Sequence, residues 1–399
     1  MAFADGTLSF KRLYVLGEAQ ARVDEPLLKR LADHAFGADT LRTADHTELG
    51  WTTGEHLLDA RFDFAKNALA DGLHFALRVD THRPPADLVR GYQKLAEEAM
   101  LEASGRAFLT RAERKEAREQ ARARADAEAR AGAFLRSRAV PAFWDLKRNE
   151  VYLAATAPGL VDQLILLFRR TFDRSLSAAT AGELASRWAA MAGETRALDD
   201  ALPAHFINPP DGAAAFSAAG ASAKDFLGTE FLIWLLYAAD VGSSEIATPQ
   251  GHSAAIVFEK ALQLQCPFRL TGTVSIAADG PAELPETAVA LATGKLPVKA
   301  GMQLAVQGEA YALTLRPDVM NFSGVRLPEP TEPTHPRARF EERIEHLRDL
   351  IGVVDGMYAT FLKRRLSNKW PATLTAMRAW IAAGRGGSRP VEPLTAAAS

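Results

Sequence analysis

The chain contains a single cysteine, Cys266, among its 399 residues. An internal disulfide is therefore excluded, and a lone thiol is more typical of a small buried residue than of a nucleophile. Long apolar runs are missing as well: the most apolar stretch, residues 226–241, is interrupted by Glu230 and is shorter than the roughly 20 residues that a transmembrane helix requires. The first residues lack the charged-then-apolar order of a signal peptide. We therefore expect a cytoplasmic protein with no membrane partner.

Patterns that mark catalytic sites are scarce. Residues 292–295 (Ala-Thr-Gly-Lys) end like a phosphate-binding P-loop, but Val289 replaces its first glycine and Leu296 its Ser or Thr. The nine histidines include neither an H-E-x-x-H motif nor a pair four residues apart. His46 and His56, each next to an acid, would meet in a metal site only by tertiary coincidence. The sequence predicts no enzymatic activity, no cofactor and no metal.

Positive charge is unevenly distributed along the chain. The formal net charge is −2, yet residues 106–148 contain twelve Lys and Arg against six acids. This segment carries +6, so the rest of the chain carries −8. A second basic zone, residues 337–378, has nine bases against five acids. Such asymmetry is typical of a surface that binds a polyanion.

The spacing of these bases is more informative than their number. Residues 86–135 are rich in Ala, Glu, Arg, Gln and Lys and contain no Pro, which predicts one long helix. On a helix, five of the bases fall within an arc of about 100°; this basic stripe consists of Arg111, Arg114, Lys115, Arg118 and Arg122. Two interpretations remain open, a stripe that binds a polyanion and a solvated helix surface with i,i+4 ion pairs.

Two aromatic residues lie beside the basic stretch. Trp51 and Phe10 are expected in the core, and the same explanation holds for Phe143 and Trp144. However, an aromatic side chain that protrudes beside cations can stack on bases or wedge between them. For Phe143 and Trp144 both interpretations remain open.

Helical and strand periodicities follow one another without strict alternation, so we predict an α+β fold with mixed or antiparallel sheets. Strands are expected at 9–16 and 73–79, and helices at 25–35 and 57–66. The predicted organisation is an N-terminal α+β part (1–85), a basic helical finger (86–141), a hairpin plus helix completing the central α+β part (142–196), a linker or insertion (197–225), a helix plus antiparallel sheet (226–335), C-terminal helices (336–383) and a disordered tail (384–399).

Several short stretches occur in an order that is characteristic of one family. They are Phe10-Lys11-Arg12-Leu13-Tyr14-Val15, Lys29-Arg30-Leu31-Ala32, Leu49-Gly50-Trp51, the strand at 73–78, the long charged helix, Pro141-Ala142-Phe143, and Ala292-Thr293-Gly294-Lys295 with Val298-Lys299. In this order they resemble the recombination-associated protein RdgC family. The likeness covers most of the chain except 197–267, and its specificity comes from the order because each motif is short.

The resemblance implies a ring-shaped homodimer whose positively charged central hole admits duplex DNA and which modulates the access of a recombinase to DNA. Two departures affect the transfer of site residues. The family's Pro-Arg-Ala-Phe element lacks its arginine here, so Arg136 and Arg138 are expected to substitute for it, while Phe143 carries over. The second DNA-facing loop corresponds to residues 277–281, which contain no base.

We therefore predict a nucleoid-associated, sequence-independent binder of double-stranded DNA without catalytic activity. Its expected DNA-binding residues are Arg111, Arg114, Lys115, Arg118, Arg122, Arg136, Arg138 and Phe143. The expected partners are duplex DNA, a second copy of the chain and a recombinase. The alternative is a protein-interaction scaffold whose basic helix docks an acidic partner, and a hydrolase built from scattered acids is the least favoured reading.

Overall fold

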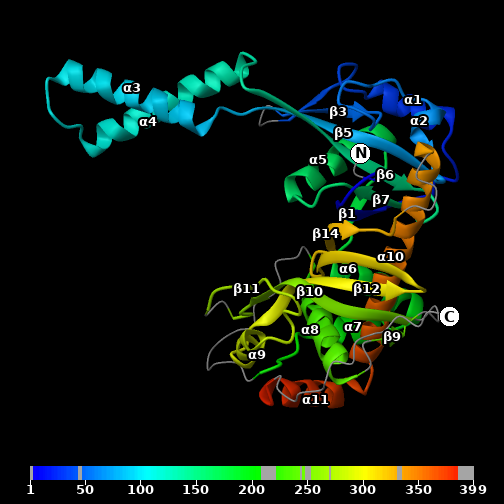
Figure 1. The fold of residues 1–399 in the computed structure, drawn as a ribbon. Coiled ribbons are helices and arrows are strands. Elements are labelled where there is room, and N and C mark those ends of the chain that lie inside the picture. Colours follow the sequence, from blue (N-terminus) through cyan, green and yellow to red (C-terminus); the bar gives the residue numbers. More distant parts are fainter. Residues whose placement is uncertain are drawn as a thin grey trace. The chain divides into compact units, whose positions relative to one another are not determined.

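The computed structural model describes residues 3–43, 47–207, 222–242, 245–247, 253–268, 271–329 and 335–384. They form two compact units. The first unit spans Val15–Leu176, and the second combines the described parts of Ala2–Tyr14 and Ser177–Ser399. Residues 208–221 of the predicted linker and the predicted tail beyond Gly384 lie outside the described residues. Both units mix helices with antiparallel strands, which confirms the α+β class (Figure 1).

The first unit is built on an antiparallel sheet with the strand order β7-β6-β5-β3-β2, and β4 pairs with β5. Its strands are β2 (Leu41–Arg42), β3 (Glu48–Thr52), β4 (Ala68–Leu69), β5 (Gly72–His82), β6 (Leu135–Asp145) and β7 (Glu150–Leu153). Its helices are α1 (Glu25–Asp33), α2 (Phe64–Asn67), α3 (Ala86–Ser104), α4 (Arg111–Arg130) and α5 (Pro158–Phe172). Strands β5 and β6 pair along their full lengths, from Gly72 opposite Asp145 to His82 opposite Leu135.

Aromatic rings from the sheet and from α5 fill the core of this unit. Trp51 on β3 contacts Phe75 on β5 edge to face, with ring centroids 5.0 Å apart. Trp144 on β6 meets Phe168 of α5 in the same geometry at 5.1 Å. The Trp51 Nε1 donates a hydrogen bond to the Thr171 hydroxyl at 2.7 Å, so the one polar atom of this buried ring is satisfied. The expected core role of Trp51 is confirmed.

Helices α3 and α4 form a helical hairpin inserted between β5 and β6, with the two helices side by side (Figure 1). The expected single helix is therefore wrong. Gly105 ends α3 in the left-handed conformation with φ +62°, which glycine adopts without a Cβ penalty. Thr110 then starts α4 through a capping box, because its side chain accepts from the Glu113 N–H and the Glu113 carboxylate accepts from the Thr110 N–H.

The second unit contains an antiparallel sheet with the order β11-β10-β12-β13-β14-β1; β9 pairs with β10 and β8 with β1. Its strands are β1 (Leu8–Val15), β8 (Leu176–Ala178), β9 (Glu245–Ala247), β10 (Ser253–Gln265), β11 (Val274–Ile276), β12 (Leu296–Val306), β13 (Glu309–Arg316) and β14 (Asn321–Arg326). Its helices are α6 (Ala181–Ala192), α7 (Thr195–Asp200), α8 (Phe226–Val241), α9 (Pro285–Ala292), α10 (Pro336–Arg365) and α11 (Trp370–Ala382).

Strand β1 supplies buried polar anchors to the second unit. The Arg12 guanidinium donates to both carboxylate oxygens of Asp355 on α10, at 2.7 and 2.9 Å. The Lys11 ammonium donates to the Ala179 carbonyl at 2.6 Å, and burial lowers the pKa of Lys11 to about 8. Phe10 stacks on Phe322 with the ring centroids 4.7 Å apart. The first stretch on which the family resemblance rests is therefore core, not surface.

Two local expectations differ from the structure. The helix expected at 57–66 is reduced to the single turn of α2, and Asp63 caps that turn by accepting from the Lys66 N–H. The long strand β10 has no counterpart in the expected elements. The alternation of side chains between the two faces of β10 is interrupted at Lys260. There φ is +64°, and the register against β12 shifts between Phe258 and Leu262. Such a bulge interrupts the period of two by which a strand is recognised.

Candidate nucleic-acid interface

The helical hairpin is held together by small residues and one polar cluster. Ala117, Ala121 and Ala125 are the buried residues of α4, and their small side chains allow α3 to approach closely. Across the pair, the Tyr92 hydroxyl of α3 donates to the Glu128 carboxylate of α4 at 2.7 Å. The Arg124 guanidinium lies over the Tyr92 ring, 4.0 Å from its centroid, and pairs with Glu128 at 3.3 Å. These contacts fix which face of α4 is turned outward.

All five residues of the basic stripe are exposed on α4. Lys115 pairs with Glu119 at 3.7 Å. Within the described part of the chain, no ion pair or side-chain hydrogen bond is made by the other four, which are Arg111, Arg114, Arg118 and Arg122. The interpretation as a surface lattice of i,i+4 pairs therefore holds for Lys115 and Arg124 but not for these four arginines.

Two acids of α4, Glu113 and Glu128, are engaged away from the stripe. Glu113 accepts from the backbone and side chain of Thr110, both at 2.8 Å, and from Arg106. Hydrogen bonding from the Thr110 N–H, assisted by its hydroxyl and by Arg106, lowers the pKa of Glu113. Glu128 is held by Tyr92 and Arg124. Capping and packing thus use these carboxylates, and the positive charge of the stripe is left largely uncompensated.

Arg136 and Arg138 lie on β6, which follows α4 in the chain. They are two residues apart, so they share one face of the strand, and both are exposed. Neither side chain has an ion pair among the residues that the structure describes. The predicted cations therefore form two groups, one on α4 and one on β6.

The structure places Phe143 in the core, which corrects its expected role as a protruding aromatic residue. Its side chain is 0% exposed and stacks on Tyr152 with ring centroids 6.3 Å apart. A Cβ added to Gly72 on the paired strand would lie only 2.4 Å from the Phe143 ring, so the ring fills the space that this glycine leaves. Trp144 is also fully buried. Phe143 has no surface through which it could contact DNA in this conformation.

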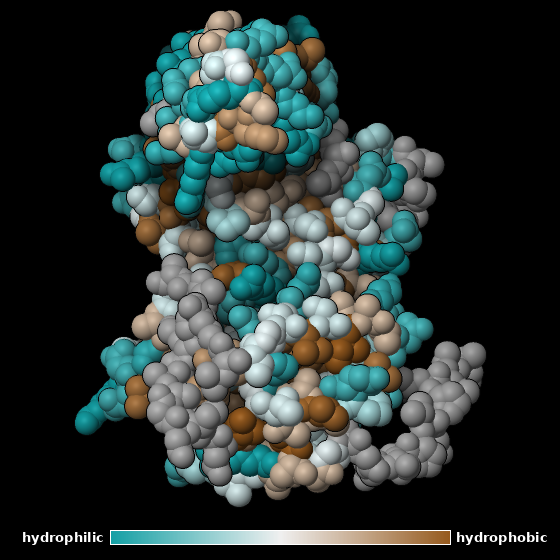
Figure 2. Space-filling model, turned by 90° about the vertical axis from the view of Figure 1, so that its left-hand side faces the viewer, coloured by the Kyte–Doolittle hydropathy of each residue, from teal (hydrophilic) through white to brown (hydrophobic). Residues whose placement is uncertain are grey.

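The exposed aromatic residue of this region is Phe108, which the sequence reasoning missed. It lies in the turn between α3 and α4, and 79% of it is exposed. Arg106 and Arg111 flank it in the chain. Figure 2 views the end of the helical hairpin and shows mainly hydrophilic side chains there, with a few apolar ones among them. Gly105 and the capping-box pair Thr110-x-x-Glu113 were the sequence signals that could have placed Phe108 in a turn.

Three buried arginines of the second basic zone have a structural role, whereas Lys363, Arg364 and Lys369 are exposed. The Arg343 guanidinium donates to the carbonyls of Phe3 and Gly6, at 3.0 and 2.9 Å. Arg365 is buried and pairs with Glu230 at 2.5 Å. Arg348 is also buried and pairs with Glu345. Arg343 and Arg365 thus tie α10 to other segments of the second unit, and Arg348 pairs within α10 itself.

Among the described residues no group of three or more His, Cys, Asp or Glu side chains is arranged to hold a metal ion. No helix within the described ranges is long and apolar enough to cross a bilayer. No protein-family model matches the chain, and no curated protein is significantly similar to it.

Proposed function

We propose that this protein binds double-stranded DNA without sequence preference, through the exposed arginines of α4 and the pair on β6. The observation that supports this proposal best is the uncompensated charge of Arg111, Arg114, Arg118 and Arg122. Arginine in such a setting forms charge-assisted hydrogen bonds with phosphate oxygens. Binding of this kind depends on phosphate charge and counterion release, and it reads no base sequence.

The arrangement of the stripe favours a polyanion over water as its partner. Arg114, Arg118 and Arg122 are spaced four residues apart, and like charges at this spacing destabilise a helix by about 0.2–0.5 kcal/mol per pair. A bound row of phosphates would offset this repulsion, because each arginine would then lie beside a negative charge. From Arg111 to Arg122 the helix rises about 16 Å, and the same length of duplex carries on the order of ten phosphates.

The exposed Phe108 gives the helical hairpin a second means of contact. An aromatic ring can stack on a base or enter a base step, and Arg111, three residues along the chain, would hold a phosphate near it. The stacking role that the sequence suggested for Phe143 therefore passes to Phe108 in this proposal. Stacking of this kind is also sequence-tolerant, because every base has a π-face.

The assembly and biological role that we propose rest on the family resemblance. They are a ring-shaped homodimer, association with the nucleoid, and control of recombinase access to DNA. A ring that encircles duplex would leave linear DNA by its ends but would be retained on a closed circle. We therefore expect slower dissociation, in the presence of competitor DNA, from a relaxed circular plasmid than from the same plasmid after linearisation.

A titration tests the DNA-binding proposal against the scaffold alternative. Fluorescence anisotropy is measured with three duplexes of unrelated sequence and equal length, and with a series of lengths of one sequence, at several salt concentrations. We expect equal affinities for the three sequences, rising affinity with length and steep weakening by salt. A protein that ignores all duplexes at moderate salt but binds an acidic polypeptide would be the scaffold, and chelator-sensitive cleavage of the duplexes would indicate a hydrolase.

A further inference from the structure

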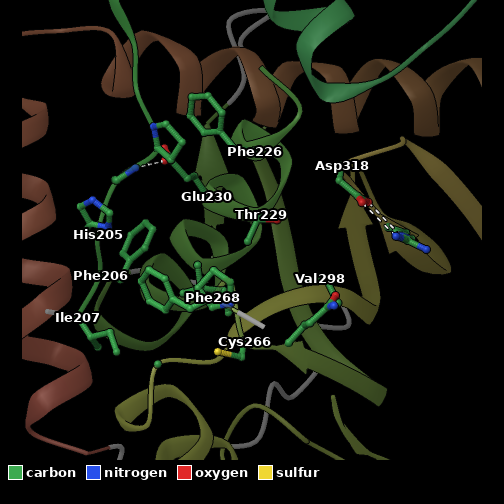
Figure 3. A pocket seen from close by; sticks show the side chains of 17 residues that line it. His205, Phe206, Ile207, Phe226, Thr229, Glu230, Cys266, Phe268, Val298 and Asp318 are labelled. Carbon is green, nitrogen blue, oxygen red and sulfur yellow. Dashed lines mark hydrogen bonds and ion pairs between the residues drawn. The ribbon is translucent and has the colours of Figure 1, made fainter. Parts of the chain in front are cut away.

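The second unit contains a cavity of about 160 Å³. Five separate segments line it: residues 203–207, the first turns of α8, the turn after β10, the start of β12, and the end of β13 with the residues that follow (Figure 3). No part of the predicted DNA-binding surface contributes to it. Any role of this cavity is therefore separate from the proposed DNA binding.

The walls of the cavity are mainly apolar. Phe206 and Phe226 are buried, and Phe268 stacks on the His205 ring with centroids 6.5 Å apart. Ile207 and Val298 add aliphatic surface. A dry cavity of about 150 Å³ with walls of this kind is large enough for one benzene ring. The size and the lining together indicate a ligand with a single aromatic ring.

The charged groups at the cavity are already paired. The Glu230 carboxylate accepts from Arg365 at 2.5 Å and from the Ala204 N–H at 2.6 Å. The buried Asp318 carboxylate is held by Arg316 at 3.1 Å. A charged ligand would lose its hydration without gaining a free counter-charge, and such burial is costly. A neutral ligand is therefore favoured.

A partly buried hydroxyl remains to orient such a ligand, whereas the other polar side chains at the cavity without a hydrogen bond to a described residue, His205 and Gln265, are exposed. The partly buried Thr229 hydroxyl lines the cavity and makes no hydrogen bond with any residue that the structure describes. A hydroxyl can both donate and accept, so it suits a ligand with one neutral polar substituent, such as a phenolic hydroxyl.

The cavity also accounts for a motif that resembled part of a P-loop. Gly294, with φ +86°, lies so close to Ile207 that an added Cβ would be 2.2 Å from the Ile207 Cδ1. Any side chain at this position would displace Ile207 from the wall. The glycine of residues 292–295 therefore shapes the cavity, and no phosphate is needed to explain it.

We propose that this cavity is a binding site for a neutral, single-ring aromatic compound with one hydrogen-bonding substituent, which the Thr229 hydroxyl orients. The site adds a small-molecule ligand to a protein whose other surface is proposed to bind DNA. It does not depend on that function, so either proposal can fail alone.

The sole cysteine provides a built-in reporter, because Cys266 lines the cavity. The full-length protein is treated with methyl methanethiosulfonate, and the single modification is followed by intact-protein mass spectrometry. The probes are 4-fluorophenol, fluorobenzene and 4-fluorobenzoate, whose binding is measured in parallel by fluorine NMR. At a probe concentration ten times its dissociation constant, 4-fluorophenol should slow the modification of Cys266 about tenfold.

Two variants and a matched control locate the site. Val298→Trp fills the cavity and should abolish 4-fluorophenol binding, whereas Val289→Trp adds the same side chain at a position that is 63% exposed on α9 and should not. Thr229→Val keeps the shape of the residue and should weaken 4-fluorophenol binding about tenfold, as loss of one buried hydrogen bond implies, while leaving fluorobenzene binding unchanged. The proposal is overturned if none of the probes slows Cys266 modification, if 4-fluorobenzoate binds best, or if Val289→Trp and Val298→Trp behave alike.

Discussion

Neutralising the centre of the basic stripe is the perturbation for which the structure gives the clearest expectation. The variant carries Arg114→Gln, Arg118→Gln and Arg122→Gln. These side chains are exposed and have no ion pair among the described residues, and Gln and Arg have similar helix propensities. The helical hairpin should therefore fold as before, because no ion pair within the described part of the chain is lost. Only the contacts to DNA phosphates should be lost.

The size of the effect follows from counterion release. Each phosphate contact contributes about −0.9 to the slope of log affinity against log salt concentration. Loss of three contacts should make the slope shallower by about 2.7 in each protomer that contacts the DNA. Between about 50 and 200 mM salt, the wild type should then lose on the order of 40-fold more affinity than the variant.

The assay is the anisotropy titration with one random duplex at four or more salt concentrations. A matched control carries Arg22→Gln, Lys29→Gln and Arg61→Gln, three exposed bases of the same unit outside the helical hairpin. The control loses the same amount of positive charge, so it corrects for the effect of the protein's net charge on DNA binding. The reasoning is refuted if the two triple variants have equal slopes, or if the stripe variant keeps the slope of the wild type.

Three further changes test the placement of individual residues. Phe108→Ala should weaken duplex binding by about 1–3 kcal/mol, as loss of one stacked base implies, without lowering the melting temperature; unchanged binding would exclude the contact. Phe143→Ala should lower the free energy of unfolding in urea by about 3–5 kcal/mol, and a neutral result would show that the ring is not core. Burial lowers the pKa of His74 to about 4. The unfolded state, with the ordinary pKa near 6.5, takes up the proton first, so stability should fall by about 2.5 kcal/mol from pH 7.5 to 4.5; an unchanged pH slope in His74→Gln would contradict this.

The basic stripe could be predicted because it depends only on spacing along one helix. Five bases at i, i+3, i+4, i+7 and i+11 share a face wherever the helix sits, and the structure exposes all five. The break in the helix was harder to predict, since α3 and α4 have the same helix-favouring composition. Gly105 and the Thr110–Glu113 box were the only local signs of the turn, and a single glycine inside a helical pattern costs about 1 kcal/mol and is often tolerated.

The environment of Phe143 could not be read from its neighbours in sequence. Adjacent strand residues point to opposite faces, so nearby arginines do not show which side an aromatic residue takes or what covers it. The cavity was beyond local reasoning for a related reason, because its walls come from segments spread over residues 203–318. No periodicity links Phe206, Thr229 and Val298; only the fold brings them together.

Arginine footprinting reports directly on whether the uncompensated arginines meet DNA. The protein is treated with phenylglyoxal with and without saturating random-sequence duplex, and modification at each arginine is quantified by mass spectrometry. We expect strong protection of Arg114, Arg118 and Arg122 by the duplex. The reactivity of Arg22 and Arg61, which are also exposed, should be unchanged. Equal reactivity of the α4 arginines with and without bound duplex would contradict the proposed interface.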